Sequence, residues 1–201
     1  MQKNLPKIYC FVDEYNLSDL SKLSKDINII YRNYDNIDHT DNILKLRKFC
    51  KSSKNKFYLS NNIKLSIQLG LDGIYIPSFN KKINYIGTHS LPKSFKIIGS
   101  AHNFNEIMIK KKQKCDQVFL SPIFKVNKSN KFLDISKFNL ITLNLKIDCI
   151  ALGGINQKNY KKIKLLRSKN ILVETGKFQA MMEIKIINTG PTTIMIDSEN
   201  N

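Results

Sequence analysis

Short apolar runs alternate with amphipathic segments along the chain. Eight runs rich in β-branched and aromatic residues predict buried strands over residues 8–12, 27–34, 57–59, 73–76, 96–99, 117–120, 147–152 and 171–173. The segments between them predict helices, because apolar residues there recur every three or four positions. These helices are expected over residues 17–23, 41–50, 63–69, 103–112 and 157–166, with a last one around residues 178–187.

Strands that alternate with helices predict a parallel sheet with right-handed crossovers. An open doubly wound sheet is one possibility. Eight units within 201 residues favour the other, an α/β fold in the form of a compact (β/α)8 TIM barrel. Its eighth unit is atypical after Thr175. We expect a single barrel domain over residues 1–187 and a polar tail over residues 188–201.

Composition excludes several classes of protein. With 42% hydrophobic and 24% charged residues, the chain has the make-up of a folded domain rather than a disordered one. No apolar run approaches the ~20 residues that span a bilayer, and the first residues lack the apolar stretch of a secretion signal. A cytoplasmic protein without a membrane partner is therefore expected. The four cysteines are far apart in sequence, which predicts free thiols.

The net charge of +17 suggests an anionic partner, either nucleic acid or a phosphorylated small molecule. Nearly all of the basic residues are lysines, however, and only three are arginines. A nucleic-acid binder usually carries more arginine, with aromatic residues between the cations. We therefore favour compositional bias as the source of the charge and leave phosphate binding open. An RNA-associated protein is the least favoured class, and no feature indicates the oligomeric state.

In a barrel of this kind, chemistry belongs to the carboxyl ends of the strands. The polar and glycine residues at those ends are Arg32, Asn61, Ser100, His102, Lys125, Lys128, Gly153 and Gly154. An arginine fork grips two phosphate oxygens, and glycines before a helix let backbone N–H groups reach a phosphate. Structural roles are the alternatives: an ion pair of Arg32 with Asp13 or Glu14, a helix cap at His102, and solvated loop lysines.

Five segments in register resemble the thiamine-phosphate synthase family, which includes a thiazole tautomerase branch. They are IIYR at 29–32, NIKLSIQLGLDGIYI at 62–76, IIGSAH at 97–102, DQVFLSPIF at 116–124 and ALGGI at 151–155. The resemblance implies a TIM barrel that joins hydroxymethylpyrimidine diphosphate to thiazole phosphate and releases pyrophosphate, with Mg²⁺ assisting, in thiamine biosynthesis. The tautomerase branch places a histidine where this chain has Pro122, so that branch is less favoured.

The resemblance also implies roles for individual residues. Arg32 would hold the diphosphate, and Ser100 or His102 would face the pyrimidine or the leaving group. Lys125 or Lys128 would fold over the diphosphate from the loop after the sixth strand. Gly153 and Gly154 would bind the thiazole phosphate.

The chain departs from the family pattern around the diphosphate. The family's Arg-x-Lys is Arg32-Asn33-Tyr34 here, so one cation is missing. Asn61 stands where the family has a Mg²⁺-binding aspartate, and it would be a weaker ligand. The second aspartate has no clear match, with Asn80 the nearest residue. A barrel of the same family that binds a phosphorylated ligand without catalysis is therefore the alternative function.

Overall fold

The computed structural model describes residues 8–35, 38–87, 89–127, 130–156, 158–166, 183–187 and 193–197. Seven strands form one parallel sheet, and each pairs with its neighbour in sequence. They are β1 (Ile8–Val12), β2 (Ile27–Tyr31), β3 (Phe57–Ser60), β4 (Gly73–Ile76), β5 (Lys96–Ala101), β6 (Gln117–Leu120) and β7 (Asp148–Ala151). These strands match the first seven runs expected from the apolar pattern.

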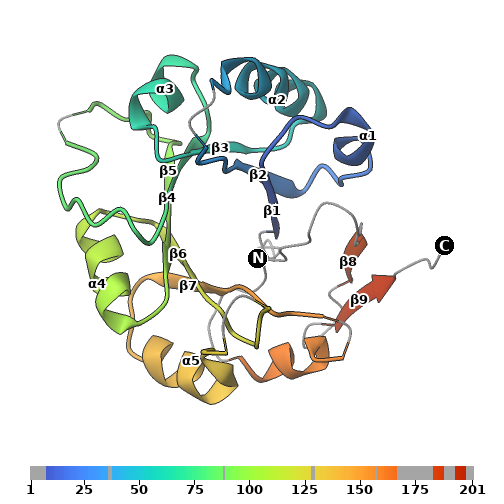
Figure 1. Ribbon diagram of the computed structural model, residues 1–201, viewed down its shortest axis with the longest axis vertical. Coiled ribbons are helices and arrows are strands. Elements are labelled where there is room, and N and C mark those ends of the chain that lie inside the picture. Colours follow the sequence, from blue (N-terminus) through green and yellow to red (C-terminus); the bar gives the residue numbers. More distant parts are fainter. Residues whose placement is uncertain are drawn as a thin grey trace.

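Five α-helices lie outside the curled sheet (Figure 1). They are α1 (Leu17–Leu20), α2 (Thr40–Ser53), α3 (Ile63–Gln68), α4 (Phe104–Lys112) and α5 (Asp134–Thr142). The sequence pattern did not predict α5, which buries Phe138. The last predicted crossover helix is a 3₁₀ helix, η1 (Tyr160–Leu165), in the structure. None of the helices in the described residues is long and apolar enough to cross a membrane.

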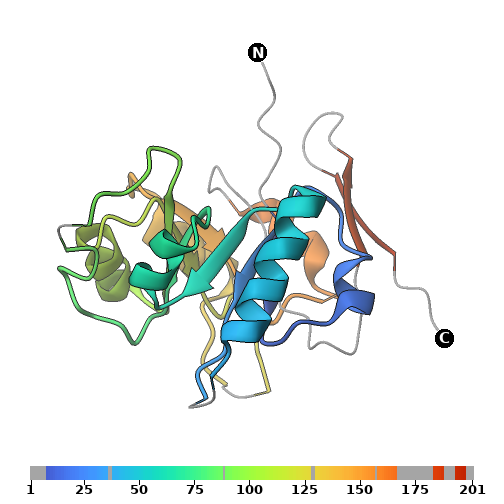
Figure 2. The ribbon, with the colours of Figure 1, turned by 90° about the horizontal axis from the view of Figure 1, so that it is seen from above.

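The closed (β/α)8 barrel expected from the sequence is wrong. The parallel sheet is open, because β1 and β7 are its two edges and the described residues place no strand between them. Instead, β8 (Glu183–Ile187) and β9 (Thr193–Asp197) pair antiparallel with each other as a separate sheet (Figure 2). Apolar residues recur at every second position in both strands, as in Ile184 and Ile186, a period that suits strands and not the expected helix. The predicted strand at 171–173 lies outside the described residues.

Both faces of the seven-stranded sheet are buried, as parallel sheets require. Successive side chains along a strand point to opposite faces, so Phe11 packs on the concave face and Val12 on the helix-covered face. The concave face holds an aromatic-rich cluster of Tyr9, Phe11, Ile30, Tyr58, Tyr75, Ile98, Phe119, Ile150 and Leu152. These side chains fill the interior, which leaves the strand ends as the place for a site.

Candidate functional site

Arg32 and Ser100 come together above the aromatic cluster. β2 ends at Tyr31 rather than at the predicted residue 34, so Arg32 stands just beyond the strand, two positions after the inward-facing Ile30. Its guanidinium carbon lies 4.8 Å from the centre of the Phe11 ring. Burial raises the pKa of Tyr75, while the neighbouring Ser100 hydroxyl and Arg32 guanidinium lower it. A cation, a hydroxyl and a phenol therefore share the centre of the rim formed by the strand ends.

Two asparagines meet where β3 and β4 end. Asn61 follows β3 in a left-handed conformation, with φ of 54°, and its backbone N–H donates to the Tyr75 carbonyl at 2.9 Å. Asn80 lies on the loop after β4, and its Nδ2 donates to Asn61 Oδ1 at 2.7 Å. We call these two residues the amide pair. Two neutral side chains thus occupy the position where the family resemblance implied a metal-binding carboxylate.

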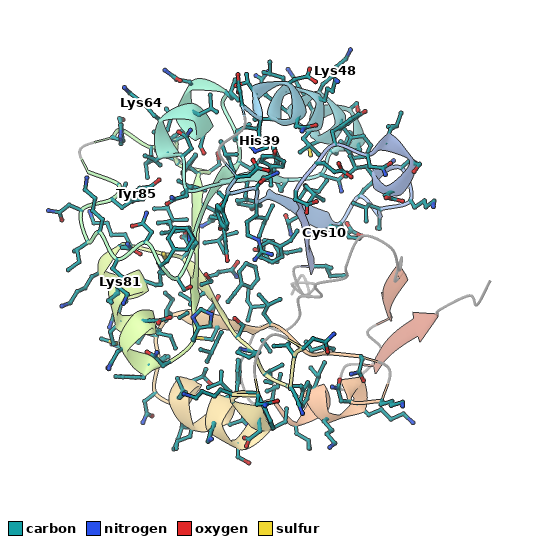
Figure 3. All side chains as sticks on the ribbon, in the orientation of Figure 1. Cys10, His39, Lys48, Lys64, Lys81 and Tyr85 are labelled. Atoms are coloured by element: carbon teal, nitrogen blue, oxygen red, sulfur yellow. The ribbon has the colours of Figure 1, made fainter. Side chains whose placement is uncertain are left out.

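An aromatic pair borders the amide pair. The Tyr34 ring lies edge-on to Phe79, with ring centres 5.3 Å apart. The Tyr34 hydroxyl and Ser60 Oγ lie 3.0 Å apart. A cavity of about 220 Å³ opens nearby between the ends of β2 and β3 and the starts of α2 and α3, and His39 lines it (Figure 3). Ser60 also lines this cavity, so the rim has a polar recess beside the aromatic pair.

His102 is joined to the start of α4. The Asn103 side chain accepts a hydrogen bond from the Glu106 backbone N–H at 3.0 Å, and Glu106 Oε2 accepts from the His102 N–H at 2.9 Å. This arrangement resembles a capping box with Asn103 as the N-cap, except that Glu106 accepts from the residue before the cap. His102 Nδ1 lies 3.0 Å from the same Glu106 oxygen, and half of the imidazole is exposed. Asn103, and not His102, is therefore the N-cap of α4, and His102 precedes it in contact with Glu106.

The turn after β7 requires glycine. Gly153 and Gly154 have φ values of 91° and 75°, and a Cβ on Gly154 would lie 2.4 Å from the Phe124 carbonyl oxygen. The Phe124 N–H donates to the Gly153 carbonyl at 3.1 Å, which holds the β6 loop against this turn. Within the described residues, no hydrogen bond occupies the N–H groups of Gly153 and Gly154. These N–H groups are available to a phosphate.

Of the two lysines expected on the loop after β6, the structure describes only one. Lys125 is exposed on the loop after β6, close in sequence to Phe124, which contacts the glycine turn. Lys128 lies outside the described residues. The role of each as a diphosphate ligand stays a prediction.

The sequence analysis missed Lys110 of α4, which is fully buried. Its ammonium donates to the carbonyls of Pro77 and Asn80 and to Gln113 Oε1, and burial lowers its pKa to about 8. Lysines such as Lys48, Lys64 and Lys81 instead lie at the periphery (Figure 3). The missed signal is spacing, since Ile107, Lys110 and Gln113 recur every third residue and share the buried face of the helix.

The residues at the amide pair do not fit Mg²⁺. This ion prefers oxygen ligands, usually carboxylates, in octahedral geometry. Asn61 Oδ1 is occupied by the Asn80 amide, and the ammonium of Lys110 donates to the Asn80 carbonyl. Across the described ranges, no three His, Cys, Asp or Glu side chains gather into a metal site.

Comparison with known proteins decides the family. The sequence model of thiamine monophosphate synthase matches residues 25–175, about three-quarters of the chain. The chain belongs to the thiamine monophosphate synthase family. The thiamine-phosphate synthase of Prochlorococcus marinus subsp. pastoris is 29% identical over 158 residues, which cover 74% of this chain and 44% of that protein. The chain thus spans less than half the length of this curated relative.

A solved structure supports the fold. Thiamine phosphate pyrophosphorylase from Pyrococcus furiosus superposes with a TM-score of 0.64 at 16% identity, covering 84% of this chain and 85% of that one. The synthase family resemblance drawn from the five motifs is therefore confirmed.

The C-terminal part resembles a different protein. Residues 155–197 match the sequence model of D-Tyr-tRNA(Tyr) deacylase. The D-aminoacyl-tRNA deacylase of a Geobacillus species (strain WCH70) is 59% identical over 34 residues, or 17% of this chain and 22% of that protein. This second similarity includes β8 and β9, the segment where the expected eighth unit fails.

Proposed function

We propose that the protein is a synthase-like transferase. It joins hydroxymethylpyrimidine diphosphate to thiazole phosphate and releases pyrophosphate in thiamine biosynthesis. The glycine turn after β7 carries the proposal, because its unoccupied N–H groups suit a phosphate, and Arg32 lies on the same rim as a cation for the diphosphate. The proposal assigns the protein to the cytoplasm, in line with cysteines that are all free thiols.

The residues divide the work as follows. Arg32 grips oxygens of the diphosphate and stabilises the charge of the departing pyrophosphate. Ser100, which lies beside the Tyr75 hydroxyl, orients the pyrimidine or its leaving group. Gly153 and Gly154 hold the thiazole phosphate, while Lys125 and Lys128 approach the diphosphate from the β6 loop. His102 stands at the edge of this group as a proton donor or a ligand contact.

A barrel-like phosphate-binding protein without catalysis is the second candidate. The amide pair favours it, because the neutral Asn61 and Asn80 neutralise no charge on a leaving group. The tautomerase reaction is less favoured, since Pro122 replaces the histidine of that branch.

The deciding experiment supplies both substrates to the whole chain and measures thiamine phosphate by chromatography, with calorimetric titration of thiazole phosphate alongside. Formation of thiamine phosphate supports the transferase. Thiazole phosphate binding without turnover supports the binding protein, and the absence of both contradicts both functions.

An arginine variant sharpens this experiment. Arg32→Gln should lower turnover at least tenfold, because a bidentate charge-assisted contact is lost. Arg47→Gln, which removes the same charge from α2, is the matched control and should retain turnover. Equal losses in the two variants would contradict the role of Arg32.

A further inference from the structure

Lys110 of α4 runs over the helix-covered face of β5 to reach the β4 loop. Its side chain passes over Gly99 of β5, where a Cβ would lie 2.9 Å from Lys110 Cδ. Glycine at this position therefore makes room for the lysine stem. The ammonium ends against the backbone of the β4 loop, with Nζ 2.7 Å from the Pro77 carbonyl and 2.8 Å from the Asn80 carbonyl.

Gln113 completes this attachment. It accepts the third hydrogen bond of Lys110 at 3.0 Å, and its Nε2 donates to the Asn80 and Lys82 carbonyls at 3.0 and 2.9 Å. Two side chains of one helical face thus hold three carbonyls of the β4 loop. The held loop aims the Asn80 amide at Asn61.

The amide pair presents donors rather than acceptors. Asn61 Oδ1 accepts from Asn80 Nδ2, and Asn80 Oδ1 accepts from the Lys82 N–H. Asn61 Nδ2, in contrast, has no hydrogen-bond partner among the residues that the structure describes. Each amide oxygen of the pair already accepts one hydrogen bond, and the unpartnered N–H groups of Asn61 Nδ2 suit an anion better than a cation.

The buried charge behind the amide pair, that of the Lys110 ammonium, is positive and also favours an anion. In the described part of the chain, no carboxylate lies within ion-pair distance of Lys110. Glu106, one turn earlier on α4, makes hydrogen bonds with His102, and its charge acts on Lys110 only from a distance, where it raises the pKa of the lysine against the larger effect of burial. A buried charge is weakly screened, so this ammonium attracts an anion at the amide pair and repels a divalent cation.

We propose that the strand end formed by Asn61 and Asn80 binds the diphosphate group directly, without a divalent metal, and that the buried Lys110 supplies positive charge and positions Asn80. The proposal rests on the proposed function, because that function makes the ligand a diphosphate. Lys110 is a positioning residue here, since it acts through Asn80.

Inorganic pyrophosphate is the probe. Calorimetric titration of the whole chain in EDTA should show binding, and addition of Mg²⁺ should strengthen it less than threefold. Lys110→Met should weaken binding in EDTA at least tenfold. Lys111→Met, an exposed neighbour with the same change of charge, should stay within threefold of the unmodified protein.

A second variant covers the case in which Lys110→Met fails to fold. The double variant Asn61→Asp, Asn80→Asp should lose metal-free binding at least tenfold and require Mg²⁺, because carboxylates replace the donor. Pyrophosphate binding by the unmodified protein only with Mg²⁺ would overturn the proposal, as would metal-free binding unchanged in every folded variant.

Thiazole phosphate binding, measured on the same samples, separates the two proposals. Absence of pyrophosphate binding with thiazole phosphate binding intact overturns the metal-free site alone. Loss of both in the unmodified protein also contradicts the proposed function.

Discussion

Two ends of the same rim are suited to phosphate in different ways. After β7, the backbone N–H groups of Gly153 and Gly154 have no hydrogen-bond partner among the described residues, and a Cβ on Gly154 would clash with the Phe124 carbonyl. After β3 and β4, side chains line the rim instead, and Asn61 and Asn80 occupy positions where the family resemblance implied carboxylates. A site made of backbone changes only if the turn changes, whereas a site made of side chains can change one residue at a time.

The largest effect on stability and on phosphate affinity is expected at the glycine turn after β7. Gly154→Ala places a methyl group against the Phe124 carbonyl and in a left-handed conformation, so we expect a loss of about 3 kcal/mol in unfolding free energy. Thiazole phosphate affinity should fall more than tenfold. Denaturant unfolding and calorimetry measure the two effects.

Gly70→Ala is the control for that experiment. Gly70 has a φ of 58° but nothing within 4 Å of its Cβ position. The unfolding free energy should then fall by only about 1–2 kcal/mol, the cost of a left-handed conformation for alanine, and thiazole phosphate binding should be retained. Equal destabilisation by the two variants would mean that the contact with Phe124 is unimportant.

An intermediate effect on stability is expected at Gly99 of β5, which lies under the Lys110 side chain that holds the β4 loop. Gly99→Ala crowds Lys110 Cδ and Cys115 Sγ, each 2.9 Å from the new Cβ, and should reduce the unfolding free energy by about 1–3 kcal/mol. A double-mutant cycle with Lys110→Ala, which removes the crowded Cγ and Cδ atoms, followed by denaturant unfolding, tests the cause. Additive losses would show that the lysine is not the crowded group.

The smallest effect is expected at Tyr34, the residue that replaces a family lysine. Tyr34→Lys should strengthen pyrophosphate binding about threefold, the size of an exposed charge interaction, whereas Tyr34→Phe should leave it unchanged. Burial raises the Tyr34 pKa to about 12, against the lowering effect of the Ser60 hydroxyl, so the phenol stays neutral near pH 7. A gain that survives 1 M salt would contradict the electrostatic explanation.

The parallel sheet was predictable because its strands are short buried runs with clear boundaries, such as residues 73–76 and 117–120, which match β4 and β6. Helix α5 was missed although Ile135, Phe138 and Ile141 recur every third residue and pack against the core, because the helix is short and only Phe138 is fully buried. Barrel closure was predicted wrongly because the count of eight units included the C-terminal segment. The synthase family match ends at residue 175, and the expected last helix beyond it falls within the deacylase match.

The sequence predicted the place of Arg32 and of the Gly153–Gly154 turn at the ends of strands, and their roles as phosphate ligands stay predictions. The sequence indicated Asn61 and Asn80 separately but not the hydrogen bond between them, because that bond depends on how the β4 loop is held. That loop is held by Lys110, a residue whose charge suggested a solvated surface position. Its burial depends on the helical face it shares with Ile107 and Gln113.

In the seven-stranded sheet each strand pairs only with strands that are its neighbours in sequence, and this topology affects folding kinetics. Within the described sheet, each strand joins the one before it, so no ladder has to wait for the two ends of the chain to meet. Contacts of short sequence separation form quickly, since little loop entropy is lost. We expect the strand ladder to assemble stepwise. Distant interior contacts, such as the bond from the Tyr9 hydroxyl to Gln117, should form last.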